Sequence, residues 1–307
     1  MNIQSVPNGT ITFPMLGEWF SISGSAEIPI FGNYSIHWYG IIIAIGFLLA
    51  YLYVSKHLKQ YGLTENNFLD ALLWAVPSGI VGARIYYVIF DFDLYRNNLL
   101  DIFKIWEGGL AIYGGVIGAC IAIIIFARVK KIHVGAILDL AGFGLLIGQT
   151  IGRWGNFINR EAFGGETDIF CRMGLTDVEG AVLPAGTTIY VHPTFLYESI
   201  WNLLGFLLIH FFAKSGKRRY DGQIFAMYVA WYGFGRMFIE GLRTDSLYTN
   251  GGIRISQLLA AVTVVAALIF LAVNHFRPHS PDKLYVNIAN SEAGTSAQDA
   301  SDDKSEE

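Results

Sequence analysis

Residues 134–161 read VGAILDLAGFGLLIGQTIGRWGNFINRE, an apolar stretch that ends abruptly in a polar cluster. The apolar part, 134–152, has the length of a helix that crosses a bilayer core, which takes about 20 residues. The cluster that follows, 153–161, holds two arginines, two asparagines and a glutamate. Polar groups at a membrane face cost free energy, so this cluster indicates a function.

The whole chain has the composition of a polytopic membrane protein. Of its 307 residues 53% are hydrophobic and only 15% are charged, and the mean hydropathy is +0.43. An open sheet could not satisfy its backbone hydrogen bonds in lipid, so the chain is predicted to be an all-α polytopic membrane protein. Seven transmembrane helices are predicted, near 36–54, 68–90, 108–127, 134–152, 193–213, 222–240 and 255–275.

Basic residues fix the expected orientation, because cytoplasmic loops are enriched in Lys and Arg. The residues before the first helix contain neither, and the loop 91–107 holds four acidic residues against two basic ones. The N-terminus is therefore expected outside and the C-terminus inside. The basic residues that mark the cytoplasmic loops are Lys56, Lys59, Arg128, Lys130, Lys131, Lys214, Lys217, Arg218 and Arg219.

The chain is predicted to have three parts. Residues 1–35 lack the basic start and apolar core of a cleavable signal, so they are interpreted as an external segment along the membrane interface. Residues 36–276 are expected to form the seven-helix catalytic domain, with an external loop at about 153–192. The part of that loop near 165–190 could be a lid, a small head or a recognition surface. Residues 277–307 are polar, acidic and without periodicity, which predicts a disordered cytoplasmic tail.

Several chemistries are not indicated. The two cysteines, Cys120 and Cys171, are expected at different depths, which argues against a disulfide. The sequence has no metal-ligand spacing, hydrolase elbow, glycine-rich phosphate loop or basic stripe. No metal, cofactor or nucleic-acid partner is therefore expected.

Polar residues of several helices are expected at one depth, in the outer half of the membrane, when position is counted at about 1.5 Å per residue. Ionisable groups at such a depth normally face a cavity and mark a substrate path. The residues predicted near this level are Tyr39, Arg84, Tyr113, Arg153, Asn156, His192, Glu198, Tyr232, Arg236 and Glu240.

Structural explanations stay open for some of these residues. Arg236 and Glu240 stand four apart and could form an ordinary helix ion pair. Arg84 could be an interhelical structural partner, and Tyr39 beside Trp38 could be an anchor of the aromatic belt.

Arginines at the outer level favour a phosphate ligand, because a guanidinium presents forked donors and keeps its charge when partly desolvated. Arg153 and Arg236 could hold a phospholipid headgroup and stabilise the charge on a departing phosphate. No side chain presents itself as a nucleophile, which favours a transferase with a second substrate over a hydrolase.

Six motifs resemble a family of bacterial membrane enzymes, the phosphatidylglycerol:prolipoprotein diacylglyceryl transferases, and their order and spacing agree along the seven-helix region. The most specific of them surrounds the polar cluster. They are HWYG at 37–40, GARIYYV at 82–88, GGLAIYGGVIG at 108–118, GRWGNFINREAFG at 152–164, HPTFLYES at 192–199 and YGFGRMFIEGLR at 232–243.

The resemblance implies an enzyme that moves the diacylglyceryl group of phosphatidylglycerol to the lipobox cysteine of a lipoprotein precursor. Such an enzyme forms a thioether, releases glycerol phosphate and performs the first step of lipoprotein maturation. The resemblance also implies a multi-pass protein of the bacterial cytoplasmic membrane, with its active site toward the outer leaflet.

The family's site residues fall on matching positions of this chain. Its fourth-helix motif places the essential pair on Arg153 and Asn156, followed by Glu161 and Gly164. The other positions implied by the resemblance are Tyr39, Glu198, Tyr232, Arg236, Glu240 and Arg243. Many members carry a histidine before the paired glycines of the third helix, where this chain has Tyr113, so the base for the substrate thiol is not identified.

The resulting hypothesis gives each group a role. Arg153 and Arg236 hold the phosphate and stabilise its departure, and nearby cations favour the substrate thiolate. Asn156 and Tyr39 orient the lipid, and Tyr113 positions a substrate. The further predicted substrate-binding residues are Arg84, Glu161, Gly164, Glu198, Tyr232, Glu240 and Arg243.

Two other function classes remain. A transporter would also place polar groups in the membrane, but would spread them over all depths or show interrupted repeats. A non-catalytic lipid-binding protein would explain the arginines and aromatic residues, but gives no reason for the carboxylates beside them.

Overall fold

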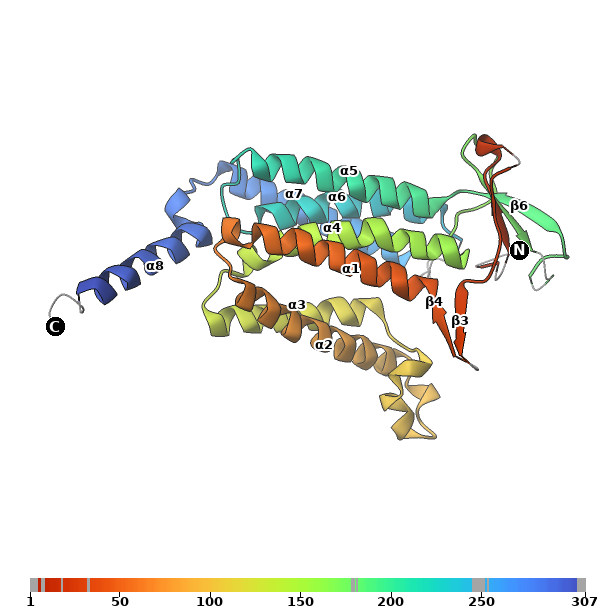
Figure 1. Ribbon diagram of the computed structural model, residues 1–307, viewed down its shortest axis with the longest axis horizontal. Helices are drawn as coiled ribbons and strands as arrows, with labels where there is room; N and C mark the ends of the chain where they lie inside the picture. The colour runs from red at the N-terminus through yellow and green to blue at the C-terminus, as the bar shows by residue number, and fades with distance from the viewer. Residues whose placement is uncertain are drawn as a thin grey trace. The chain divides into compact units, whose positions relative to one another are not determined.

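The computed structural model describes residues 5–6, 9–17, 19–31, 34–177, 180, 182–244, 252 and 254–302. Most of these residues are helical (Figure 1). Six helices are long and apolar enough to cross a membrane. The prediction of a polytopic helical membrane protein is therefore confirmed in its coarse form. The α-helices are α1 (Trp38–His57), α2 (Glu65–Phe90), α3 (Ile112–Lys130), α4 (Val134–Asn159), α5 (Thr194–Lys214), α6 (Gln223–Ile239), α7 (Ile255–Phe276) and α8 (Tyr285–Asp302).

Seven of these helices coincide with the predicted membrane segments. The sixth, α6, has 17 residues, which makes it the shortest of the seven. The prediction of seven spans and of their orientation stays a prediction.

Helix α4 is longer than expected. It was predicted to end near residue 152, but it continues through the polar cluster to Asn159. No proline or glycine pair interrupts the cluster, and Phe157 stacks on Phe195 of α5 with ring centroids 4.5 Å apart. The helix ends where Arg160 and Ala162 take positive φ angles of 52° and 57°. Arg153 and Asn156 therefore project from a regular helix and not from a loop.

The chain divides into two compact units. The first contains residues 1–54, 141–218 and 223–278, and the second contains 55–140, 219–222 and 279–307.

The first unit contains β-strands that the sequence analysis did not predict. β1 (Thr10–Thr12), β2 (Ser21–Ile22), β5 (Met173–Asp177) and β6 (Thr187–Val191) form an antiparallel sheet in the order β2-β1-β5-β6. β3 (Glu27–Phe31) pairs with β4 (Tyr34–His37), and η1 (Pro14–Leu16) follows β1. One sheet is thus formed by strands from two places in the chain: residues 1–35, expected along the membrane interface, and the external loop expected at about 153–192.

A hydrophobic cluster joins this sheet to the ends of α4 and α5. Ile11, Met173 and Leu175 of the sheet pack with Phe157 of α4 and Phe195 of α5, and all five are buried. The buried carboxylate of Asp177 accepts hydrogen bonds from backbone N–H groups that follow β5, at 2.7 to 2.9 Å. The sheet is consequently a packed head that fixes the backbone next to the polar cluster.

The described part of the C-terminal segment, up to residue 302, contains η7 (Pro281–Lys283) and α8. The disordered tail expected at 277–307 stays a prediction, and its residues 303–307 lie outside the described residues. The N–H of Tyr285, at the first residue of α8, donates to the Asp221 carboxylate at 2.9 Å, and His133 contacts the same carboxylate at 2.9 Å. A carboxylate at a helix N-terminus stabilises the helix.

Small residues bring α2 and α3 together in the second unit. A Cβ on Gly82 would lie 2.5 Å from the carbonyl oxygen of Gly114 and 3.0 Å from the Cα of Gly118. A Cβ on Gly79, one turn earlier, would lie 3.4 Å from its nearest neighbour. The second unit also contains η2 (Leu58–Tyr61), η3 (Phe92–Leu94), η4 (Leu99–Phe103) and η5 (Ile105–Glu107).

This packing predicts that Gly82→Ala destabilises the protein, by about 1 to 3 kcal/mol, because the added methyl forces two backbones apart. Gly79→Ala is the matched control. Its free energy of unfolding should stay within about 1 kcal/mol of the parent's, since the substitution gains the same helix propensity without the overlap. Thermal unfolding in detergent measures both. Equal unfolding temperatures for the two variants would contradict the close contact.

Candidate functional site

The carboxylate of Glu198 contacts three arginines in the first unit. It lies 2.6 Å from Nη2 of Arg153, 3.2 Å from Nη1 of Arg236 and 3.5 Å from Nη1 of Arg243. The Glu198 side chain is only 4% exposed. A buried carboxylate is stable when it is paired, and this one links α5 to α4, to α6 and to the segment after α6.

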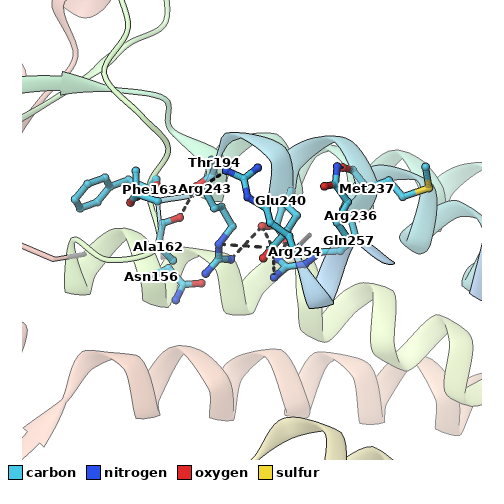
Figure 2. Close-up of polar contacts among 12 residues, drawn as sticks. Asn156, Ala162, Phe163, Thr194, Arg236, Met237, Glu240, Arg243, Arg254 and Gln257 are labelled. Carbon is cyan, nitrogen blue, oxygen red and sulfur yellow. Dashed lines mark hydrogen bonds and ion pairs between the residues drawn. The ribbon is translucent and has the colours of Figure 1, made fainter. Parts of the chain in front are cut away.

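Glu240, in η6 (Glu240–Leu242), is the second carboxylate of the cluster. It lies 2.5 Å from Nη2 of Arg236 and 3.9 Å from Nε of Arg243. Figure 2 shows Glu240 beside Arg243 and Arg236. The pair of Arg236 and Glu240 is therefore more than a single-helix ion pair, because both residues also belong to the network around Glu198.

The contacts place three guanidinium groups around two carboxylates. Their side chains are 11% to 19% exposed, whereas Glu198 and Glu240 are 4% and 2% exposed. The arginines carry one positive charge more than these two glutamates. A partly desolvated cluster with a positive excess and forked donors suits an anion with several oxygens, such as a phosphate.

Asn156 links this cluster to Glu161. Its Oδ1 accepts from Arg153 at 3.2 Å, and its Nδ2 donates to Glu161 at 2.9 Å. Asn159 also donates to Glu161, at 3.3 Å. The predicted cluster 153–161 therefore orients its first arginine through its own amides and carboxylate.

Gly164 lies where the head meets the end of α6. Its N–H donates to the His192 carbonyl at 2.9 Å, and the residue forms a bridge with Arg243. A Cβ on Gly164 would overlap the His192 side chain and crowd the Leu242 carbonyl. The hydroxyl of Thr194 donates to the Ala162 carbonyl, at 2.5 Å, within the same junction (Figure 2). Gly164 thus permits the backbone approach that positions Arg243.

Two tyrosines of the prediction border this region. The ring of Tyr39 lies against Gly155, where a Cβ would be 2.5 Å from the ring. Tyr232, one turn before Arg236, stacks on Tyr228 with ring centroids 5.9 Å apart. Tyr39 is consequently held by α4, one residue from Asn156, and not only by the aromatic belt.

Arg84 and Tyr113 belong to the second unit. Arg84 is 7% exposed, and its guanidinium donates to backbone carbonyls of residues 101–109. Tyr113, in the first turn of α3, has its ring 6.4 Å from that of Tyr86. The Arg84 contacts agree with the structural alternative, whereas substrate roles for both residues stay predictions.

The sequence analysis missed several polar residues near the cluster. Arg254 donates to the Arg243 carbonyl at 3.3 Å, and Gln257 donates to the Met237 carbonyl at 2.7 Å (Figure 2). Asn202 is 1% exposed, and neither polar atom of its amide has a hydrogen-bond partner within the described part of the chain. Asn202 stands four residues after Glu198 on α5, so the two side chains share one face of the helix. This spacing was the sequence signal that could have identified Asn202.

Comparison with known proteins gives one consistent family. The profile described as prolipoprotein diacylglyceryl transferase matches residues 27–273, which include the whole arginine and glutamate cluster. The chain is 44% identical over 251 residues to the phosphatidylglycerol–prolipoprotein diacylglyceryl transferase of Listeria welshimeri, over 81% of this chain and 90% of the relative. The protein of the same description from Limosilactobacillus reuteri is 43% identical over 265 residues, over 84% and 93% of the two chains.

The cluster predicts that Glu198→Gln lowers the free energy of unfolding by about 3 kcal/mol or more, since it leaves three partly buried arginines with one carboxylate fewer. Asp93→Asn is the matched control, because Asp93 pairs with Arg96 at 2.8 Å where both side chains are more than 70% exposed. That change should cost less than about 1 kcal/mol. Thermal unfolding in detergent compares them, and a Glu198 variant as stable as the control would refute the central role of this carboxylate.

Proposed function

Because this chain belongs to the prolipoprotein diacylglyceryl transferase family, we propose that it transfers the diacylglyceryl group of phosphatidylglycerol to a lipoprotein precursor. The acceptor is the lipobox cysteine, the products are a thioether and glycerol phosphate, and the reaction is the first step of lipoprotein maturation. The observation that carries this proposal is the contact of three arginines with Glu198, which supports a phosphate-binding role for this cluster.

The reaction needs stabilisation of a leaving phosphate. The sulfur of the precursor cysteine attacks the glyceryl carbon, the bond from that carbon to the phosphate oxygen breaks, and the phosphate leaves with the bonding electrons. Arg153 and Arg236 carry donors already held by Glu198 and Glu240, so little reorganisation is needed when negative charge grows on the phosphate.

The carboxylates have a positioning role in this proposal. Glu198 and Glu240 are more deeply buried than the arginines, so a ligand meets the guanidinium groups first. Glu161 acts through Asn156, which accepts a hydrogen bond from Arg153. Asn156 and Tyr39 orient the lipid, and Tyr113 positions a substrate.

The thiol must lose its proton, and the arginines contribute to this step as well. A cysteine thiol has an ordinary pKa of about 8.5, and neighbouring cations favour its thiolate. The positive excess of the cluster therefore serves both the acceptor and the leaving group.

We place the protein in the cytoplasmic membrane of a bacterium with seven spans, the N-terminus outside and the active site toward the outer leaflet. Helix α6, with 17 residues, is about 26 Å long at 1.5 Å per residue, close to the thickness of a bilayer core. The basic loops after the first, third and fifth helices support this orientation.

Replacing either arginine by lysine tests the phosphate role. Arg153→Lys and Arg236→Lys keep the charge but lose the forked donors, so kcat should fall by about 100-fold. Purified protein in liposomes is incubated with phosphatidylglycerol and a lipobox peptide, followed by mass analysis of the peptide and detection of glycerol phosphate. Arg96→Lys, at an exposed position, is the control that should keep full activity.

The same assay separates the alternatives. Peptide modification that requires the peptide cysteine supports the transferase. Folded protein that binds phosphatidylglycerol but modifies no peptide would indicate a lipid-binding or transport protein instead. Full activity of both lysine variants would refute forked-donor catalysis.

The contact of Tyr39 with Gly155 gives a second test. Gly155→Ala places a methyl group inside the volume of the Tyr39 ring, and a displacement near an active site of about 1 Å can cost about 100-fold in rate. We expect transferase activity to fall by at least about tenfold on this basis. Gly152→Ala, whose Cβ would lie 3.4 Å from Ile43, is the control and should stay active. Equal activities of the two variants would mean that Tyr39 need not be held in place.

A further inference from the structure

Residues 91–110, between α2 and α3, expose many apolar side chains. Trp106, Phe103 and Leu100 are 76%, 74% and 72% exposed. Leu94, Leu99 and Leu110 are also exposed. Contiguous apolar surface of this kind marks a membrane or protein contact, because soluble surfaces rarely carry it.

The backbone of this segment is held by one buried side chain. Nε of Arg84 donates to the carbonyl of Ile102 at 2.7 Å, and Nη1 donates to those of Gly108 and Gly109 at 2.7 and 2.9 Å. Nη2 donates to the carbonyl of Asp101 at 2.7 Å and to that of Lys104 at 3.4 Å. A guanidinium has five N–H donors, so these five carbonyls use its full capacity.

Further contacts make the segment compact. The ring of Tyr95 is buried and lies under the Arg84 guanidinium, 5.0 Å from its central carbon. Gly109, at φ 73°, leaves no room for a Cβ beside that guanidinium. Lys104 pairs with Asp101 at 2.7 Å. The side chains of Asp101 and Lys104 therefore pair with each other, and the backbone carbonyls of this part of the segment face Arg84, while the apolar side chains are left on the outside.

We propose that residues 91–110 form an interfacial anchor whose apolar side chains lie in the headgroup and acyl boundary of the bilayer, and that Arg84 holds its shape. The segment joins two helices that are each long and apolar enough to cross a membrane, so both of its ends stand at a bilayer surface. Trp and Leu side chains held outward next to a bilayer partition into that boundary. Because the flanking helices place this surface at the bilayer, lipid is the partner that its apolar side chains contact.

The anchor gives Arg84 a role that differs from phosphate binding. The N–H of Ala111 donates to the carbonyl of Ala83 at 3.1 Å, and Tyr113 follows two residues later. Arg84 is therefore a positioning residue that holds the anchor and the start of α3 in fixed positions relative to each other.

Spin labelling in liposomes tests the anchor directly. In a Cys120→Ala, Cys171→Ala background, one variant carries a nitroxide at Phe103→Cys and the matched control carries it at Asp93→Cys, on the same segment. Collisions with oxygen report lipid and collisions with a water-soluble nickel chelate report water. We expect the oxygen-to-nickel ratio to be several-fold higher at position 103 than at position 93.

Two results would overturn the proposal. Equal ratios at the two positions would place the apolar face in water, and protection of position 103 from both reagents would mean that protein covers it. Arg84→Gln adds the second measurement, since glutamine offers two N–H donors in place of five. The label at position 103 should become more mobile and lose its high ratio; an unchanged spectrum in folded Arg84→Gln protein would remove Arg84 from the proposal.

Discussion

The shared carboxylate of Glu198 is the interaction on which the site depends. An unpaired charge at that burial would be costly, and so would three neighbouring guanidinium groups without a carboxylate among them. The contacts with Arg153, Arg236 and Arg243 satisfy both requirements at once. They also fix the positions of α4, α5 and the end of α6 along their axes relative to one another. The ion network therefore determines the arrangement of the helices that carry it.

The β-sheet head also supports this ion network, through its backbone contact with the residues after α6. Glycine at position 164 lets the strand that leads to α5 approach the residues after α6, and Arg243 lies at that contact. The arginines are therefore held by both their carboxylate partners and the backbone around them. Such preorganisation lets donors stabilise a developing charge without first being reoriented.

Hydropathy predicted the helices well, because each membrane segment carries its own signal within about 20 residues. Arg153, Arg236 and Glu198 were predicted to lie together because arginines and carboxylates at one depth need a common explanation, whereas Arg243 was implied only by the family resemblance. The pairing of β1 with β5 was not, because short strands far apart in sequence have no local signal for their partners. The extension of α4 to Asn159 depended on the stacking of Phe157 on Phe195, which the sequence does not show. Asn202 was missed although it stands four residues after Glu198 on α5.

The pairing of Ile11 with Leu175 has a consequence for biogenesis. β1 is made before any membrane helix, whereas its partner strand is made only after α1 to α4, so the N-terminal segment must wait while those helices insert. Contacts of such long sequence separation form late, because the intervening chain has to be ordered first. The sheet of the head can therefore close only once β6 has been made, and the bridge of Gly164 with Arg243 only after α6 has followed.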